Sequence, residues 1–186
     1  GGITITGLNP DSQQGDKVIL DILKRCGGKF KPVEGGLHFD RSLLKATEID
    51  LADCPDLGPI LFTLGCFCSG ETVIRNAGRL RLKESDRIEA MQTELRKMGA
   101  RIEVDGDTVH IQGVALHAPN APLSGHNDHR IVMALAVAAI ASGLPALLCG
   151  AEAVDKSWPA FWSVLRGLGA KVELNTDKQE EFDIKA

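Results

Sequence analysis

Five of the seven residues from position 81 to 87 carry a charge, and a helical pattern begins at the end of this stretch. The charged residues are Arg81, Lys83, Glu84, Asp86 and Arg87. Helix capping explains part of the cluster, with Ser85 as the N-cap and Asp86 in the first turn. It does not explain the cations, because Arg87 would face the positive end of the helix at a cost of a few tenths of a kcal/mol. An anionic ligand would reverse that cost.

A second charged cluster, residues 126–130, stands directly before the apolar run 131–141. Asn127 or Asp128 can cap a helix there, and Arg130 again meets a positive helix end. A surface salt bridge is the simpler alternative. His129 and Asp128 are also metal-ligand types, but adjacent residues rarely face one centre and no partner cluster follows, so we predict no metal site.

Asp56 and Lys156 also stand just before segments that read as helices. Taken singly, Asp56 fits an N-cap or turn residue and Lys156 a solvated lysine. If the helices run side by side, however, all four places meet at one end of the domain and form an electropositive patch. The predicted ligand is a compact, multiply charged anion. Asp56 and Glu84 among the cations are the mixture that proton transfer requires.

Two alternating kinds of unit must position these residues. Amphipathic helices end at Gly27, Gly99 and Gly169, at intervals of about 70 residues, and each is followed by a strand-like stretch. Apolar helices over 60–68 and 131–141 end in Ser-Gly and run into a strand. Residues 3–6 fit the same strand position with no helix before them. Ordinary α/β alternation with coincidental spacing is the alternative to this three-fold repeat.

The run 131–141 has no polar face, so we expect water on none of its sides. This predicts sheets wrapped around a core of helices. We expect one domain over 1–174, truncated at its N-terminus so that its first helix is missing, and a polar C-terminal tail over 175–186 that is a weak strand or mobile.

Composition narrows the classes of function. The 186 residues carry a net charge of −4, and six Phe, two Trp and no Tyr leave few stacking platforms, so nucleic acid is not the expected partner. No apolar run approaches the roughly 18 residues of a membrane span, and we expect a cytoplasmic protein. Five cysteines without paired spacing are typical of reduced thiols in a core.

Three motifs in order resemble a known family. They are Arg81-Leu82-Lys83-Glu84-Ser85-Asp86-Arg87, Asn127-Asp128-His129-Arg130 before an apolar helix, and Lys156-Ser157-Trp158-Pro159 followed after one residue by Phe161. The sequence is similar over residues 1–174 to the C-terminal half of the EPSP synthases. The resemblance implies an α/β fold of repeated βαβαββ units, an inside-out α/β barrel with buried parallel helices and sheets outside.

The resemblance also implies an activity: transfer of the enolpyruvyl group of phosphoenolpyruvate to the 5-hydroxyl of shikimate 3-phosphate, with no metal or organic cofactor. Asp56 matches the carboxylate that deprotonates the hydroxyl, and Glu84 the one that moves a proton at the methylene carbon. Arg87 and Arg130 match the pair that grips the phosphoenolpyruvate carboxylate. The other substrate-binding candidates are Lys156 at the phosphate, Lys83 on the shikimate side, and Arg81, Asp128 and His129 from the same motifs.

One departure is Arg79, which stands where some members carry an asparagine near the shikimate ring. The implied partner is the companion N-terminal domain, absent from this chain, and we expect the fragment alone to be inactive and the full enzyme to be a monomer. Three alternatives stay open: an anion- or RNA-end-binding module of the same repeat fold, a relative of the UDP-N-acetylglucosamine enolpyruvyl transferases, and a purely structural domain.

Overall fold

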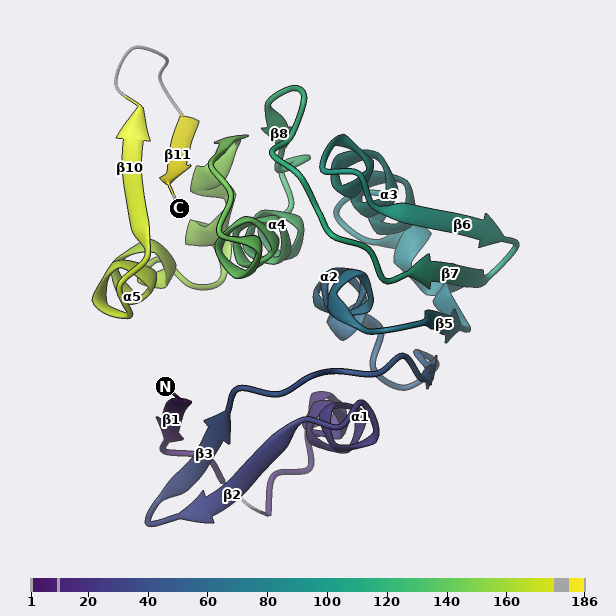
Figure 1. The fold of residues 1–186 in the computed structure, drawn as a ribbon, viewed down its shortest axis with the longest axis vertical. Coiled ribbons are helices and arrows are strands. Elements are labelled where there is room, and N and C mark those ends of the chain that lie inside the picture. The colour runs from purple at the N-terminus through teal and green to yellow at the C-terminus, as the bar shows by residue number, and fades with distance from the viewer. Residues whose placement is uncertain (1, 10, 176–180, 186) are drawn as a thin grey trace.

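The structure is a computed structural model that describes residues 2–9, 11–175 and 181–185. Three sheets surround helices, and the chain passes through them in order (Figure 1). The first unit comprises β1 (Gly2–Thr6), the short 3-10 helix η1 (Gly15–Val18), α1 (Ile19–Arg25), β2 (Lys29–Val33) and β3 (Gly36–Asp40). Its sheet has the order β1-β3-β2, with both pairs antiparallel.

The second and third units share one topology. The second comprises β4 (Glu48–Asp50), η2 (Pro55–Leu57), α2 (Gly58–Phe67), β5 (Glu71–Arg75), η3 (Ala77–Leu82), α3 (Arg87–Lys97), β6 (Arg101–Asp105) and β7 (Thr108–Gln112). The third comprises β8 (Leu123–Ser124), α4 (His129–Ser142), β9 (Ala146–Cys149), η4 (Ala151–Lys156), α5 (Phe161–Gly167), β10 (Lys171–Asn175) and β11 (Glu181–Lys185). The sheet orders are β4-β5-β7-β6 and β8-β9-β11-β10, and only the first pair of each is parallel.

The repeat predicted from the sequence is therefore present, as βαβαββ in the second and third units. Among the described residues the first unit has no counterpart of β4 and α2. The three helix-ending glycines, Gly27, Gly99 and Gly169, have φ values of 84°, 86° and 96°. This left-handed conformation is the one that glycine adopts most easily, which is why these residues mark the helix ends in the sequence.

One capping prediction was wrong. Ser85 does not cap α3; Asp86 does, and its carboxylate accepts hydrogen bonds from the amides of Ile88 and Glu89. The last helix, α5, begins at Phe161 with Ala160 in the N-cap position. The N-cap of α4 is Asp128, one of the two residues proposed for it.

Part of the segment expected to be a polar tail is a strand. β11 lies between β9 and β10 and pairs antiparallel with both, and Ile184 on it is 1% exposed. The weak-strand alternative therefore holds for residues 181–185, whereas residues 176–180 and 186 lie outside the described residues. Burial of the Ile184 side chain helps to hold this strand in the sheet.

Helices α2 and α4 pack side by side between the sheets, and both are seen close to end-on in Figure 1. The Thr63 hydroxyl on α2 donates to the carbonyl oxygen of Ala134 on α4 at 3.0 Å. At the helix starts, Arg130 in the first turn of α4 bonds to Asp56, which lies just before α2, so the two helices run in the same direction. Their N-terminal ends therefore lie at the same end of the molecule.

The prediction that water flanks no side of residues 131–141 was wrong for part of the helix. Val137 and Ala141 on α4 line an apolar groove of about 810 Å³, together with residues of α2, the 41–44 segment and the 113–115 segment. Most of α4 is buried, as expected.

Two of the core cysteines lie next to the groove. Burial raises the pKa of the Cys66 and Cys68 thiols to about 12, so both are protonated at neutral pH. The described helices are all too short or too polar to cross a membrane.

Candidate active site

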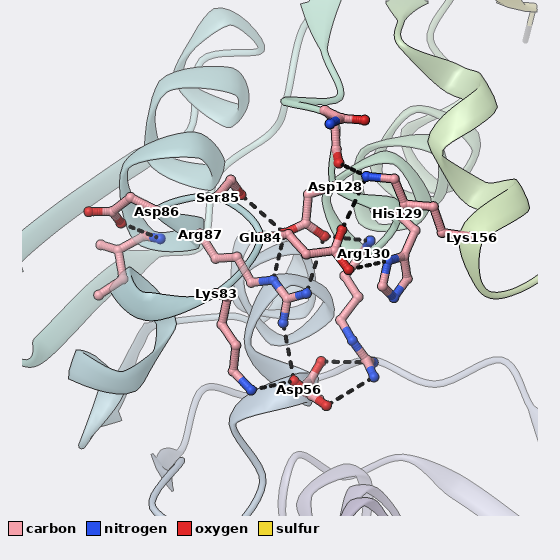
Figure 2. A network of polar contacts seen from close by, with 12 residues as sticks. Asp56, Lys83, Glu84, Ser85, Asp86, Arg87, Asp128, His129, Arg130 and Lys156 are labelled. Carbon is pink, nitrogen blue, oxygen red and sulfur yellow. Dashed lines mark hydrogen bonds and ion pairs between the residues drawn. The ribbon is translucent and has the colours of Figure 1, made fainter.

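Asp56 lies at the centre of three cations (Figure 2). It sits in the 3-10 turn η2, immediately before α2. Its Oδ1 lies 3.1 Å from Nζ of Lys83 and 3.1 Å from Nη1 of Arg87, and its Oδ2 lies 3.1 Å from Nη2 of Arg130. Partial burial pushes the pKa of Asp56 up, but the Lys83 hydrogen bond and the charges of Arg130, Lys83 and Arg87 outweigh it and hold the pKa below its ordinary value. Asp56 is therefore ionised.

Arg87 and Asp128 form a buried ion pair behind Asp56. Arg87 Nε donates to Asp128 Oδ2 at 2.8 Å and Nη2 donates to Oδ1 at 3.2 Å, the two-pronged geometry that a guanidinium and a carboxylate prefer. Arg87 is 2% exposed and Asp128 0%. Burial raises the pKa of Asp128, but its hydrogen bonds with Arg87, the Arg130 amide and Ser85 more than compensate, so the pKa lies below the ordinary value. The pair fixes the direction in which Arg87 points.

Glu84 forms a second group with His129 and Lys156. Its Oε1 lies 3.2 Å from Nδ1 of His129, and its Oε2 lies 3.5 Å from Nζ of Lys156. Lys156 also donates a hydrogen bond to the carbonyl oxygen of Asn127. The Glu84 side chain is 39% exposed and that of Lys156 is 42%, so both are accessible to a ligand.

The structure thus brings together eight of the nine candidate residues. Six of them have exposed side-chain surface: Asp56, Lys83, Glu84, His129, Arg130 and Lys156. Arg87 and Asp128 are almost fully buried; Asp128 caps α4 and orients Arg87, and Arg87 points its Nη1 at Asp56. Arg81 is elsewhere, because its guanidinium bonds to Asp86 and to the carbonyl oxygen of Gly106. The helix starts converge as the sequence analysis predicted.

Ser85 is a site residue whose role the sequence analysis missed. Its hydroxyl donates to Asp128 Oδ2 at 3.1 Å and so ties the start of α3 to the start of α4. The sequence held a signal for this, since two capping residues stand side by side at 85 and 86 and one helix takes only one of them. Because Asp86 caps α3, the hydroxyl of Ser85 remains available for another partner, which is Asp128.

Glu84, Asp128 and His129 present ligand atoms within 4.8 Å of one another, a spacing that a metal ion could bridge. The two carboxylates of this group already have cationic partners, however. Both oxygens of Asp128 accept from Arg87, and Glu84 faces Lys156. Because cations surround these three residues, the electrostatics favour an anion at this place rather than a metal ion. The chemistry that the site supports is proton transfer by Asp56 or Glu84 at an anionic substrate.

Comparison with known proteins assigns this arrangement to a class. The family model for EPSP synthase (3-phosphoshikimate 1-carboxyvinyltransferase) matches residues 1–165. The 3-phosphoshikimate 1-carboxyvinyltransferase of Clostridium acetobutylicum is 44% identical over 172 residues, which are 92% of this chain and 40% of the relative. That of Methanocaldococcus jannaschii is 40% identical over 173 residues, again 92% of this chain and 40% of the relative. Both are enzymes by name.

A solved structure supports the same class. An EPSP synthase from Acinetobacter baumannii superposes with a TM-score of 0.75 at 26% identity, covering 89% of this chain and 41% of that one. The chain belongs to the EPSP synthase family, and its fold is the inside-out α/β type that the resemblance implied. The match favours this family over the UDP-N-acetylglucosamine enolpyruvyl transferases. The chain spans 40% of the length of the curated relatives it matches.

Proposed function

We propose that the chain supplies one half of the active site of an enzyme that transfers the enolpyruvyl group of phosphoenolpyruvate to the 5-hydroxyl of shikimate 3-phosphate and releases phosphate. The observation that carries the proposal is the meeting of two carboxylates with Lys83, Arg87, Arg130 and Lys156 at one end of α2 and α4. The curated relatives are named for this reaction. Because the chain spans 40% of their length, the remainder of such a protein would provide the other half.

The first proposed step is an addition. Asp56 accepts the proton of the 5-hydroxyl while the oxygen of that hydroxyl bonds to C2 of phosphoenolpyruvate. Glu84 donates a proton to C3, which becomes a methyl group. Arg87 and Arg130 hold the carboxylate of phosphoenolpyruvate in place of Asp56. Arg130 offers both Nη1 and Nη2, whereas Arg87 offers Nη1, because its Nε and Nη2 stay bound to Asp128. Lys156 holds the phosphate, and Lys83 lies on the shikimate side. His129 contacts Glu84 and keeps its carboxylate directed at C3.

The second proposed step is an elimination. Glu84 takes a proton back from the methyl group, the C2–C3 double bond re-forms, and the C2–O bond to phosphate breaks with the electron pair leaving on phosphate. The charge that builds up on the departing phosphate is stabilised by Lys156, which is already held in place by the Asn127 carbonyl. Asp128 and Ser85 act only by positioning Arg87 and the two helix starts.

The proposal extends to the organisation of the protein. Residues 1–174 form one domain that works with a companion N-terminal domain, and the complete enzyme is a cytoplasmic monomer. Both domains are needed for turnover, because the cations described here account for the phosphoenolpyruvate side of the reaction and bring only Lys83 to the shikimate side. Productive geometry requires both substrates to be held at once.

Calorimetry with phosphoenolpyruvate and with inorganic phosphate tests the binding half of the proposal on the chain alone. We expect both anions to bind and Arg130→Met to weaken binding by about tenfold, as expected for the loss of a charged hydrogen-bonding partner. Arg75→Met is the matched control, because Arg75 carries the same charge but pairs with Glu48 on the surface. Equal effects of the two variants would show that binding is non-specific and overturn the assignment.

Phosphate release from both substrates tests the catalytic half. We expect none from the chain alone, and turnover when the missing part of a family member is added as a separate polypeptide. Glu84→Gln should abolish the restored turnover, because an amide cannot move the proton at C3. Turnover by the chain alone would show that it needs no companion domain.

A further inference from the structure

Glu94 is a buried charge that the proposed reaction does not use. It lies on α3 and is 1% exposed. Its Oε2 accepts from Nζ of Lys97 at 2.7 Å and from the amide of Ser124 at 2.8 Å, and its Oε1 lies 3.0 Å from Nε2 of His126. Burying a carboxylate costs several kcal/mol unless such partners are present. The arrangement therefore suggests a specific task for this residue.

Two of the three partners of Glu94 belong to the loop that leads from β8 into α4. Within that loop His126 and Asn127 have φ values of 50° and 53°, in the left-handed region that residues other than glycine seldom occupy. Two such residues in succession cost on the order of 1 kcal/mol each and persist only where the surroundings enforce them. The enforcing contacts are those of Glu94, together with a hydrogen bond from the Asp128 amide to the Gly125 carbonyl.

This strained loop holds the residues that place the cations of the site. The Asn127 carbonyl accepts from Lys156, Asp128 receives the two-pronged bond of Arg87, and Arg130 follows in the first turn of α4. Lys97 strengthens the attachment from the other side, because its ammonium group also donates to the Pro122 carbonyl at 2.9 Å. A shift of this loop would move all three cations at once.

We propose that Glu94 is a positioning residue: through His126 and Ser124 it holds the 124–128 loop in its strained conformation and thereby sets the spacing of Arg87, Arg130 and Lys156. This inference rests on the proposed function of those cations as an anion-binding site. Glu94 touches no substrate. Its carboxylate acts at a distance, by fixing the backbone that carries the binding groups.

The test compares Glu94→Gln with Thr63→Val by calorimetry with phosphoenolpyruvate on the chain. The glutamine keeps the shape of the side chain but removes its negative charge, so the ion pair with Lys97 is lost and the bonds to Ser124 and His126 lose their charge assistance. We expect Glu94→Gln to weaken binding by about tenfold. Thr63→Val removes a buried hydrogen bond between α2 and α4 away from the site, so it controls for loss of stability and should leave the affinity unchanged.

A double-mutant cycle with His126→Ala separates positioning from general damage, and His126→Ala also serves if the Glu94 variant does not fold, because His126 is partly exposed. If Glu94 acts through His126, the double variant should bind phosphoenolpyruvate with the same affinity as whichever single variant binds it less tightly. Fully additive losses, or an unchanged affinity in Glu94→Gln, would overturn the inference.

The outcome for the unmodified chain distinguishes the two proposals. If it binds neither phosphoenolpyruvate nor inorganic phosphate, the proposed function fails. Amide hydrogen exchange across residues 124–130 then still decides whether Glu94 holds the loop, because Glu94→Gln should speed exchange there by tenfold or more while Thr63→Val should not. If the unmodified chain binds and the loop does not respond, only the role of Glu94 is refuted.

Discussion

Replacing Asp56 with asparagine should tighten, not weaken, the binding of an anion to this site. In the structure, the Asp56 carboxylate occupies Arg87 and Arg130 at 3.1 Å each, and these are the groups that we assign to the carboxylate of phosphoenolpyruvate. An incoming anion must therefore displace an anion that is already present. The asparagine would keep the size of the side chain but remove the competing charge.

The size of the effect follows from exposure. The Asp56 side chain is 37% exposed, so each of its ion pairs is partly screened by solvent and is worth about 0.2–1 kcal/mol. Only the pairs with Arg87 and Arg130 compete directly with the ligand. Releasing both corresponds to about 0.4–2 kcal/mol, or roughly a 2- to 30-fold lower dissociation constant for phosphoenolpyruvate.

Titration calorimetry of Asp56→Asn and Glu48→Gln against phosphoenolpyruvate measures the effect. Glu48 is a matched control, because it is an exposed carboxylate whose partner Arg75 lies outside the site. Both variants remove one negative charge, so they change the overall field alike. Tighter binding in Asp56→Asn alone is expected. Unchanged or weaker binding in that variant would refute the idea that Asp56 competes for these arginines, although the variant should still lose turnover in the complete enzyme.

Three further predictions concern stability. Asp128→Ala should lower the free energy of unfolding, measured in urea, by about 3–5 kcal/mol, because it leaves the buried Arg87 guanidinium without its partner. Asp86→Ala removes a helix cap and an exposed ion pair and should cost about 1 kcal/mol. Equal losses in the two variants would contradict the claim that the Arg87–Asp128 pair is buried and strong. The pKa values of Asp56 and Asp128 are held below their ordinary value of 3.8, so the stability they contribute is present above that pH and is lost as the pH falls through the folded-state values. Urea midpoints should therefore fall below about pH 4, less steeply in Asp128→Ala, and parallel curves would count against this linkage. Thr63→Val should cost about 1 kcal/mol of unfolding free energy, and an unchanged urea midpoint would show that the bond to Ala134 adds nothing.

The helix ends could be predicted from the sequence because their signals are local. Gly27, Gly99 and Gly169 end helices through their own backbone freedom, and the apolar spacing before each of them is set by the helical period. The strands β4 and β8 could not be predicted in this way. They have three and two residues, and so short a segment shows no alternation to detect.

The place of β11 depended on the rest of the sheet. Its sequence alternates Phe182 and Ile184 with charged residues, which is typical of a strand, but its position in the middle of the sheet follows from the backbone groups that β9 and β10 offer on either side. The positioning role proposed for Glu94 could not be predicted from the sequence either. On an amphipathic helix a glutamate is expected to face water, and only the packing of the 124–128 loop against α3 buries it.

From the sequence alone it followed that charged residues gather at helix starts, and that these starts meet at one end of the domain if the helices run side by side. Which carboxylate pairs with which cation was decided by tertiary structure. The pairs join Arg87 to residues 31 and 41 positions away, and Arg130 to one 74 positions away. Capping and periodicity act within about one helical turn, so they can be read along the chain. An ion pair between distant residues exists only after α2, α3 and α4 have packed together, and that packing determines whether a carboxylate lies open to a ligand, as Asp56 does, or is sealed behind an arginine, as Asp128 is.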